Sequence, residues 1–194
     1  SAIDEAAHVA KQNPFDYRMK LLEGRPRFQK VLEKVVRASK WGRILQKGQG
    51  LGISIHKTRG SIAAAVIEIL TDINGMLKLN KVWIAIDCGK VINPNIVRAQ
   101  MEGGFTFGLS AALGEEITLK EGRVEQSNFH DYTILRLKGS PEIFVEIIES
   151  DYDIGGVGEV AVPLAAPALT NAIFSSSRRR IRSLPLSKHG IKIS

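Results

Sequence analysis

Cysteine is almost absent from this sequence of 194 residues, in which Cys88 is the only one. A single thiol excludes an internal disulfide and any metal site built from several thiolates of this chain. An iron–sulfur cluster takes about four protein ligands, so none is expected here. Long apolar runs are missing as well, since no stretch approaches the ~18 residues that a membrane-spanning helix needs. Residues 1–5 are neither basic nor apolar, which argues against a signal peptide at this position.

Aromatic residues are scarce, whereas basic residues are in excess and give a formal net charge of +7. The excess is concentrated in residues 18–47 and 177–182. In the first segment the basic residues are interleaved with apolar ones, which is typical of the solvated face of a helix. The second follows a predicted helix, whose negative dipole end favours cations. Because no nucleic-acid-binding motif accompanies the charge, a basic nucleic-acid-binding module is the least favoured function.

The first 45 residues are expected to form a helical segment. Apolar residues recur at helical spacing in residues 2–12 and 15–22, and Asn13-Pro14 separates the two because proline restricts the residue before it. Pro26 suits the first turn of a third helix, which has one apolar face.

After residue 48 the apolar pattern changes from the period of a helix to that of a strand. Between the second and third predicted strands, Asn74-Gly75 is the signal of a tight hairpin. The strands are predicted over residues 50–58, 61–73, 76–88 and 142–149, with a short hairpin formed by residues 116–120 and 123–126.

Two long helices complete the prediction. Asn93-Pro94 starts one that continues to about Leu113, and the other extends from about Pro163 to Ser176. The pattern predicts an α+β fold, in which an antiparallel sheet of about four or five strands packs against these two helices, with an N-terminal helical layer. Residues 1–45 form the helical segment and residues 46–194 the second domain.

A glycine-rich loop ending in Glu159 precedes the second long helix. Glycines such as Gly158 let another group approach the backbone, and a helix N-terminus favours an anion. Burial would raise the pKa of Glu159 and the helix dipole would lower it. The simpler interpretation is a carboxylate that stabilises the dipole by a few tenths of a kcal/mol. On these residues alone, that interpretation is favoured over a catalytic one.

Gln100 lies about two turns into the first long helix, shortly before Gly103 and Gly104. Its amide donates and accepts hydrogen bonds at once, as the polar edge of a cofactor requires. Each helical glycine costs up to ~1 kcal/mol, so these glycines imply the close approach of a backbone or a ligand. An exposed glutamine beside glycines that serve helix packing explains the same residues equally well.

Other candidates are weaker. His56, His8 and His189 have no metal-ligand spacing. His130 is expected to have a role in a structural turn or in packing. The glycine run of residues 48–52 precedes a strand and not a helix, so it is not a dinucleotide-binding fingerprint.

Several motifs occur together in one order, and as a set they resemble the xanthine dehydrogenase and aldehyde oxidase family, in particular the branch of the isoquinoline 1-oxidoreductase β-subunits. The resemblance extends from residue 1 to about residue 186. Its motifs are Ile3-Asp4-Glu5-Ala6-Ala7, Asn13-Pro14-Phe15-Asp16-Tyr17-Arg18, Asp87-Cys88-Gly89, Asn93-Pro94, Gln100-Met101-Glu102-Gly103-Gly104, Gly108-Leu109-Ser110-Ala111-Ala112-Leu113, Asn128-Phe129-His130-Asp131-Tyr132, Gly156-Val157-Gly158-Glu159 and Asn171-Ala172-Ile173-Phe174.

The resemblance implies a molybdenum ion held by a pyranopterin, molybdopterin alone or as a dinucleotide, with no protein ligand to the metal. The implied reaction hydroxylates an electron-poor carbon of an N-heterocycle or an aldehyde, with water as the oxygen source. Glu159 falls on the family's general base and Gln100 on a glutamine that hydrogen-bonds the cofactor. Gly103, Gly104 and Gly158 are assigned to cofactor contact. A base of this kind works best with a pKa near neutral pH.

Two departures from the family pattern matter. Val160-Ala161 stand where this branch has Pro-Gly, and family large subunits are several hundred residues long. The resemblance therefore implies that residues 46–194 are a C-terminal molybdenum-cofactor-binding domain that holds part of a site and is inactive alone.

The implied partners are the N-terminal remainder of the large subunit, a small subunit carrying iron–sulfur clusters, and a small aromatic heterocycle or aldehyde as substrate. Periplasmic export is suggested, with the cytoplasm as the alternative. A cofactor-free remnant with a structural or interaction role is the alternative function.

Overall fold

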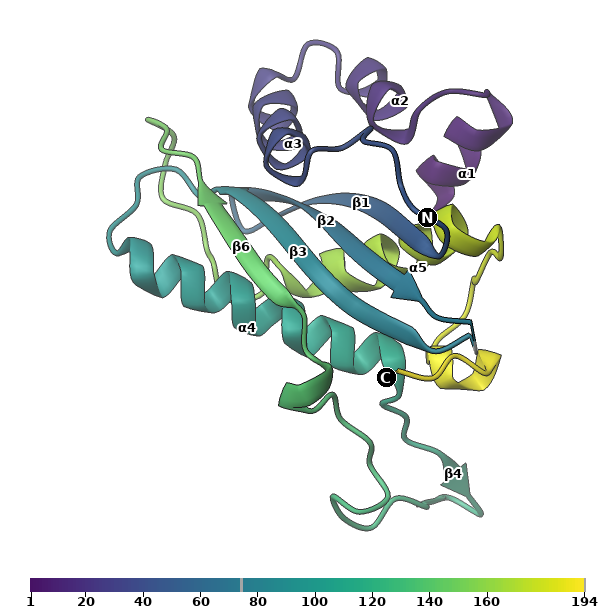
Figure 1. Ribbon diagram of the computed structural model, residues 1–194. Helices are drawn as coiled ribbons and strands as arrows, with labels where there is room; N and C mark the ends of the chain where they lie inside the picture. Colours follow the sequence, from purple (N-terminus) through teal and green to yellow (C-terminus); the bar gives the residue numbers. More distant parts are fainter. Residues whose placement is uncertain (74, 194) are drawn as a thin grey trace.

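A four-stranded sheet separates two helical layers in the computed structural model, which describes residues 1–73 and 75–193 (Figure 1). Helices α1–α3 cover one face and the long helices α4 and α5 cover the other (Figure 1). Asn74 of the expected Asn-Gly turn lies outside the described residues. The elements are α1 (Ala2–Val9), α2 (Pro14–Leu21), α3 (Pro26–Ser39), β1 (Gln49–Thr58), β2 (Ser61–Thr71), β3 (Leu77–Asp87), α4 (Pro94–Leu113), β4 (Leu119–Lys120), β5 (Arg123–Val124), β6 (Glu142–Ile147) and α5 (Val162–Ser177), with two short 3₁₀ turns, Leu137–Gly139 and Leu186–His189.

The N-terminal layer is fixed to the sheet by apolar burial and by hydrogen bonds from Arg18 and Arg27. Val31, Leu32 and Val35 of α3 are fully buried against the sheet. Arg18 of α2 lies 2.6 Å from the Asp4 carboxylate and donates a hydrogen bond of 3.3 Å to the carbonyl of Ile53 on β1. Three short helices with few contacts to one another are thereby attached to one surface.

The α+β class and the packing of both long helices on the sheet are confirmed, but the sheet is mixed. Strands β1, β2 and β3 are antiparallel, as their short connections dictate, whereas β6 pairs parallel to β3, with Lys81 opposite Glu142. The chain leaves β3 at its C-terminal end, returns through α4, and enters β6 so that both strands run in the same direction. The prediction of an antiparallel sheet was drawn from hairpin signals, and β6 has none because a long crossover precedes it.

Helix α5 lies unusually close to β1. A Cβ added to Gly50 would lie 2.2 Å from the Ala172 carbonyl oxygen, and one added to Gly52 would lie 2.0 Å from that of Ala168. Ser54, two residues further along the same face of β1, is small enough to donate a 2.8 Å hydrogen bond to the Leu164 carbonyl. Within the glycine run of residues 48–52, Gly50 and Gly52 therefore form a surface for helix packing.

The core has two parts, one on each side of the sheet. The larger lies between the sheet, α4 and α5, and includes the fully buried Met101, Phe105 and Leu109 of α4. Gly108 lets α4 contact α5, because a Cβ there would lie 2.4 Å from the Val162 carbonyl oxygen. Within the described chain, no helix combines the length and apolar character that crossing a bilayer requires.

Asp87 connects three segments at the end of β3. Its carboxylate is buried and accepts hydrogen bonds from Arg27 at 2.9 Å, from the Gly89 amide at 2.9 Å and from Ser150 at 2.7 Å. Burial acts to raise the pKa of Asp87, but the hydrogen bonds from Arg27, Gly89 and Ser150 outweigh it and hold the pKa below its usual range. Neighbouring Cys88 is buried, and burial raises the pKa of its thiol.

Replacing Gly52 with alanine should destabilise the fold, because the new Cβ overlaps the backbone of α5. We expect the free energy of unfolding in urea to fall by about 1–3 kcal/mol. Gly103→Ala is the matched control, since an added Cβ there meets nothing within 4 Å and alanine favours a helix. Equal losses in the two variants would contradict the packing role of Gly52.

Asp87→Asn should lower stability at pH 7 by about 1–3 kcal/mol, because it weakens a buried set of hydrogen bonds. A depressed carboxyl pKa adds stability that is present above the unfolded pKa of ~4 and is lost as the pH falls through the lower folded pKa. The variant should therefore have a weaker acid dependence of unfolding below pH ~4. The exposed Asp151→Asn should change neither quantity.

Candidate functional site

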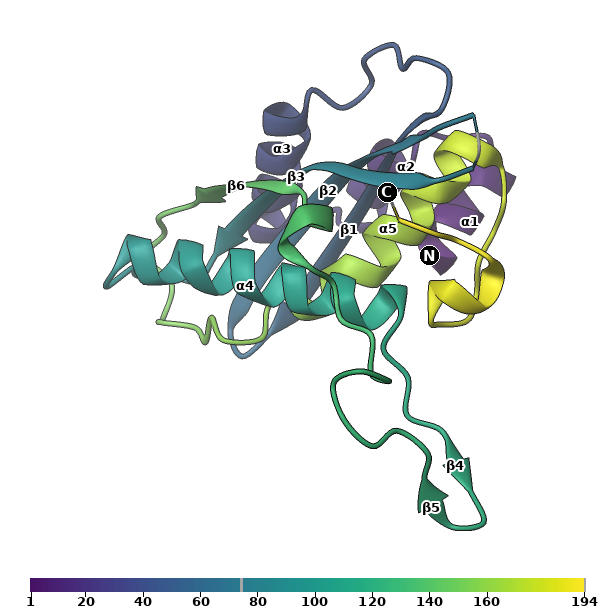
Figure 2. The ribbon, with the colours of Figure 1, turned by 60° about the horizontal axis from the view of Figure 1, so that its bottom comes forward.

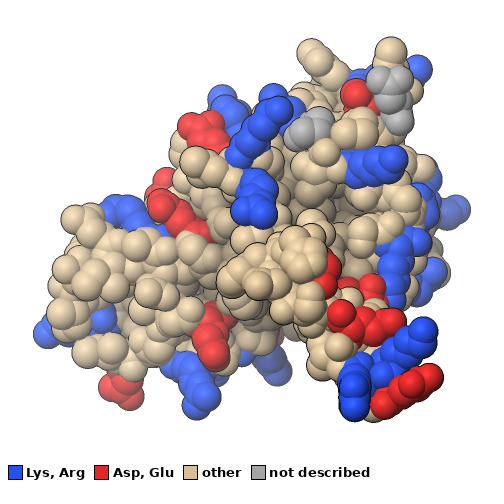
Figure 3. All heavy atoms as spheres, turned by 90° about the horizontal axis from the view of Figure 1, so that it is seen from below, with Lys and Arg blue, Asp and Glu red and all other residues tan. Residues whose placement is uncertain are grey.

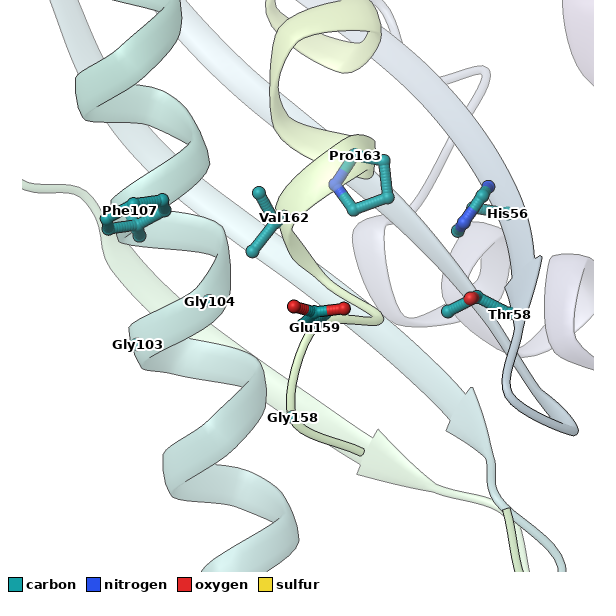
Figure 4. A pocket seen from close by; sticks show the side chains of 9 residues that line it. All are labelled: His56, Thr58, Gly103, Gly104, Phe107, Gly158, Glu159, Val162 and Pro163. Atoms are coloured by element: carbon teal, nitrogen blue, oxygen red, sulfur yellow. The ribbon is translucent and has the colours of Figure 1, made fainter. Parts of the chain in front are cut away.

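A hollow of about 530 Å³ lies where the start of α5, the middle of α4 and the end of β1 meet (Figure 4). Glu159 lies between α4 on one side and β1 on the other (Figure 4). Four of the five predicted site residues line this hollow, and Gln100 does not. The lining residues are His56, Thr58, Gly103, Gly104, Phe107, Gly158, Glu159, Val162 and Pro163.

The loop that carries Glu159 is fixed on both sides. Before it, the Gly155 amide donates to the Cys88 carbonyl at 2.8 Å and the Gly156 amide to the Arg59 carbonyl at 2.8 Å. Gly155 must be glycine, because a Cβ there would lie 2.3 Å from the Ser61 hydroxyl. These bonds clamp the loop to the β1–β2 turn and to the end of β3.

After Glu159, the side chains of Val160 and Ala161 are buried in the larger core. Val160-Ala161, which replace the Pro-Gly of the resembling branch, thus hold the loop by apolar packing. Glu159 itself is exposed, and its carboxylate has no hydrogen-bond or ion-pair partner among the described residues. Glu159 therefore has no structural role that a contact within the described chain explains.

The start of α5 offers fewer free amides than the sequence suggested. The Val162 amide donates to the Glu159 carbonyl at 3.2 Å and the Leu164 amide to the Ala161 carbonyl at 3.2 Å, while Pro163 has no N–H. The expected set of free N–H groups is thus largely used within the first turn. What remains for an anion is the dipole of the helix.

Helix α4 forms the opposite wall. Gly103 is exposed, and an added Cβ there meets nothing within 4 Å, whereas one on Gly104 would contact Ala161 and Val162 at 3.4 and 3.6 Å. Gly104 is therefore explained in part by helix packing, and Gly103 leaves open backbone toward the hollow. Gln100 is exposed on α4, about one turn before Gly104.

The residues present fit one wall of a cofactor site. Gly103 and Gly158 leave backbone open, because a Cβ on either would meet nothing within 4 Å, and Glu159 supplies a free carboxylate beside them. Within the described residues, no group of three or more His, Cys, Asp and Glu side chains could hold a metal directly. The roles assigned to Gln100 and to the site glycines remain predictions.

Five lining residues were not predicted as site residues, namely His56, Thr58, Phe107, Val162 and Pro163. His56 was set aside because it has no metal-ligand spacing. The available signal was alternation along β1, which places His56 and Thr58 on the same face as Gly50 and Gly52. That face could be assigned to α5 only once the contact between β1 and α5 was known.

Comparison with known proteins identifies the family. Residues 5–141 match the molybdopterin cofactor-binding domain. The chain is 35% identical over 190 residues to the β-subunit of isoquinoline 1-oxidoreductase from Brevundimonas diminuta, covering 96% of this chain and 24% of that protein. It is 31% identical over 115 residues to the large subunit of nicotine 6-hydroxylase from Paenarthrobacter nicotinovorans, covering 56% of this chain and 14% of that protein.

Among solved structures, quinoline 2-oxidoreductase of Pseudomonas putida 86 matches with a TM-score of 0.57 and 26% identity, over 65% of this chain and 17% of that one. The chain therefore belongs to the molybdopterin cofactor-binding domain family of xanthine dehydrogenase and aldehyde oxidoreductase large subunits. It spans about a quarter or less of the length of these relatives.

Glu159→Gln should leave the free energy of unfolding unchanged, because the carboxylate has no partner in the described chain. If the carboxylate instead stabilised the dipole of α5, the variant would lose ~0.3–1 kcal/mol of its free energy of unfolding. Glu68→Gln is the contrasting control, since Glu68 is buried between Arg43 and Asn80. Glu68→Gln should lower the free energy of unfolding, measured in urea, by about 1–3 kcal/mol. A loss of ~0.3–1 kcal/mol or more in Glu159→Gln would favour the structural interpretation.

Proposed function

We propose that this chain is the C-terminal part of a molybdenum hydroxylase large subunit, in which Glu159 is the general base. The reaction is hydroxylation of an electron-poor carbon of an N-heterocycle or an aldehyde, with water as the oxygen source. The observation that carries the proposal is an unpartnered carboxylate on a clamped loop inside a hollow with open backbone. Family membership supports the class of chemistry.

Each site residue has a stated task in this proposal. When bound, a molybdopterin cofactor, alone or as a dinucleotide, supplies the metal and takes up the electrons of the reaction. Glu159 accepts the proton of the water that becomes the new hydroxyl group, and its free carboxylate oxygens suit that task. Gln100 hydrogen-bonds a polar edge of the cofactor. Gly103, Gly104 and Gly158 let the cofactor approach the backbone.

The exposure of the site supports the proposal that other segments of a larger subunit complete and cover it. Glu159 and Gly158 are open to solvent, although a base of this kind works best where water is excluded. Residues 115–130 extend away from the layered body (Figure 2) and carry exposed apolar side chains, among them Ile117, Leu119 and Phe129. Seen from below, wide uncharged stretches separate the charged groups (Figure 3). We propose that the remainder of a large subunit covers these surfaces.

A small subunit with iron–sulfur clusters is the proposed electron acceptor, since this chain has one cysteine and holds no cluster itself. Export to the periplasm is proposed from the resemblance alone.

Purified alone, this chain should retain no molybdenum cofactor through gel filtration and should hydroxylate nothing, because it offers only one wall of the site. Elemental analysis by mass spectrometry measures the molybdenum content. Near-stoichiometric molybdenum in the isolated chain would contradict the proposed incompleteness.

In the complete enzyme, Glu159→Gln should lower the rate of single-turnover reduction by substrate ~10²–10⁴-fold, because the amide cannot accept the proton. Molybdenum content should stay normal. Gln100→Ala should lower molybdenum content and spare the rate per bound molybdenum. A Glu159→Gln enzyme with normal molybdenum and a near-normal rate would remove the catalytic assignment and leave the structural alternative.

A further inference from the structure

Strand β6 forms one edge of the sheet, whose strand order is β1-β2-β3-β6 (Figure 1). The Ile148 amide, directly after the strand, donates a 2.8 Å hydrogen bond to the Ile86 carbonyl of β3. Because the N–H and C=O groups alternate in direction along a strand, those of Phe144 and Glu146 also point to β3. The outward groups belong to the residues that alternate with these, Ile143, Val145 and Ile147. Among the described residues, no hydrogen-bond partner is found for these outward N–H and C=O groups.

The other edge of the sheet, β1, is partly capped by side chains of the chain itself. The Ile53 carbonyl accepts hydrogen bonds from the buried side chains of Arg18 at 3.3 Å and Asn171 at 3.1 Å. The edge of β6 has no such partners within the described chain. It also lacks the proline, the lysine and the β-bulge with which native sheets commonly protect an edge. An edge that is open in this way is a template for another strand.

The apolar layer between the sheet and α4 is open at the same edge. The side chains of Ile143, Val145 and Ile147 pack against the larger core but remain partly exposed. Their three partners in β3 are fully buried, namely Val82, Ile84 and Ile86. Burial is therefore complete one strand in from the edge and incomplete at the edge. A further strand would cover these apolar side chains and bind the outward backbone groups at once.

We infer that β6 binds a further strand, supplied by the remainder of a large subunit, which extends the sheet beyond its present edge. This inference rests on the proposed function. The chain spans about a quarter or less of the length of its relatives, so most of each relative consists of segments that this chain lacks. The strand that fits has apolar residues on the α4 side, next to Val145. It has polar residues on the α3 side, where the side chains of Glu142 and Glu146 are 61% and 44% exposed.

Amide hydrogen exchange tests the pairing, compared residue by residue between this chain alone and the complete large subunit. The amides of Ile143, Val145 and Ile147 should exchange about 100-fold or more slowly in the complete subunit, because the added strand binds them. The amides of Phe144 and Glu146 are matched controls on the same strand, since β3 protects them in both proteins. Mass spectrometry with electron-transfer fragmentation resolves these single residues.

A pair of variants distinguishes a bound strand from any other cover. Val145→Pro removes one outward N–H, and an edge strand tolerates proline where that N–H points to solvent. Val145→Ala is the matched control, because it shortens the side chain and keeps the N–H. In the complete subunit, Val145→Pro should restore fast exchange at Ile143 and Ile147, whereas Val145→Ala should leave both amides protected. Continued protection of the Glu146 amide in both variants shows that β6 itself is intact.

Three results would overturn the inference. The first is equal exchange of the outward amides in the two proteins. The second is protection that Val145→Pro leaves unchanged, since the cover would then not be a strand. Protection in this chain alone, together with a dimer in light scattering, would assign the edge to a second copy instead.

Turnover separates this inference from the proposed function. A complete enzyme that hydroxylates substrates, loses that activity in Glu159→Gln and exchanges its outward β6 amides freely retains the function and loses only the added strand.

Discussion

The close contact between α5 and β1 is the constraint on which the rest of the structure depends. Glycines at 50 and 52 remove the side chains that would separate the strand from the carbonyls of Ala168 and Ala172. Gly108 does the same for α4, so that three elements meet at one end of α5. A helix held this closely begins at a fixed point above the sheet. The hollow is the space that remains where its first turn stops and α4 and β1 continue.

The same contact also fixes the position of the loop that carries Glu159. The loop before α5 is clamped to Arg59 and Cys88 on one side and buried through Val160 and Ala161 on the other, which leaves Glu159 as the projecting residue between two fixed points. Because the backbone on both sides of Glu159 is fixed, little backbone entropy is lost when its carboxylate binds or reacts. The same packing that stabilises the domain therefore preorganises the base in the proposed reaction.

Much of the fold could be predicted from the sequence, because local signals determine it. Periodicity and proline positions indicated both long helices and the three strands joined by short turns. The parallel pairing of β6 could not be predicted, since a crossover leaves no local turn signal. Some residues of the candidate site could likewise be predicted from the sequence and others could not. Glu159 and Gly158 follow from a motif, whereas His56 lies about a hundred residues away and joins them only through the packing of β1 on α5.

An experimental structure of the complete enzyme with its cofactor tests the central claim most directly, through the position of the Glu159 carboxylate relative to the metal. The account predicts that the carboxylate faces the metal within hydrogen-bond reach, about 2.6–3.2 Å, of an oxygen bound there or of one intervening water. A cofactor bound elsewhere, with the Glu159 carboxylate still directed to solvent, would contradict it.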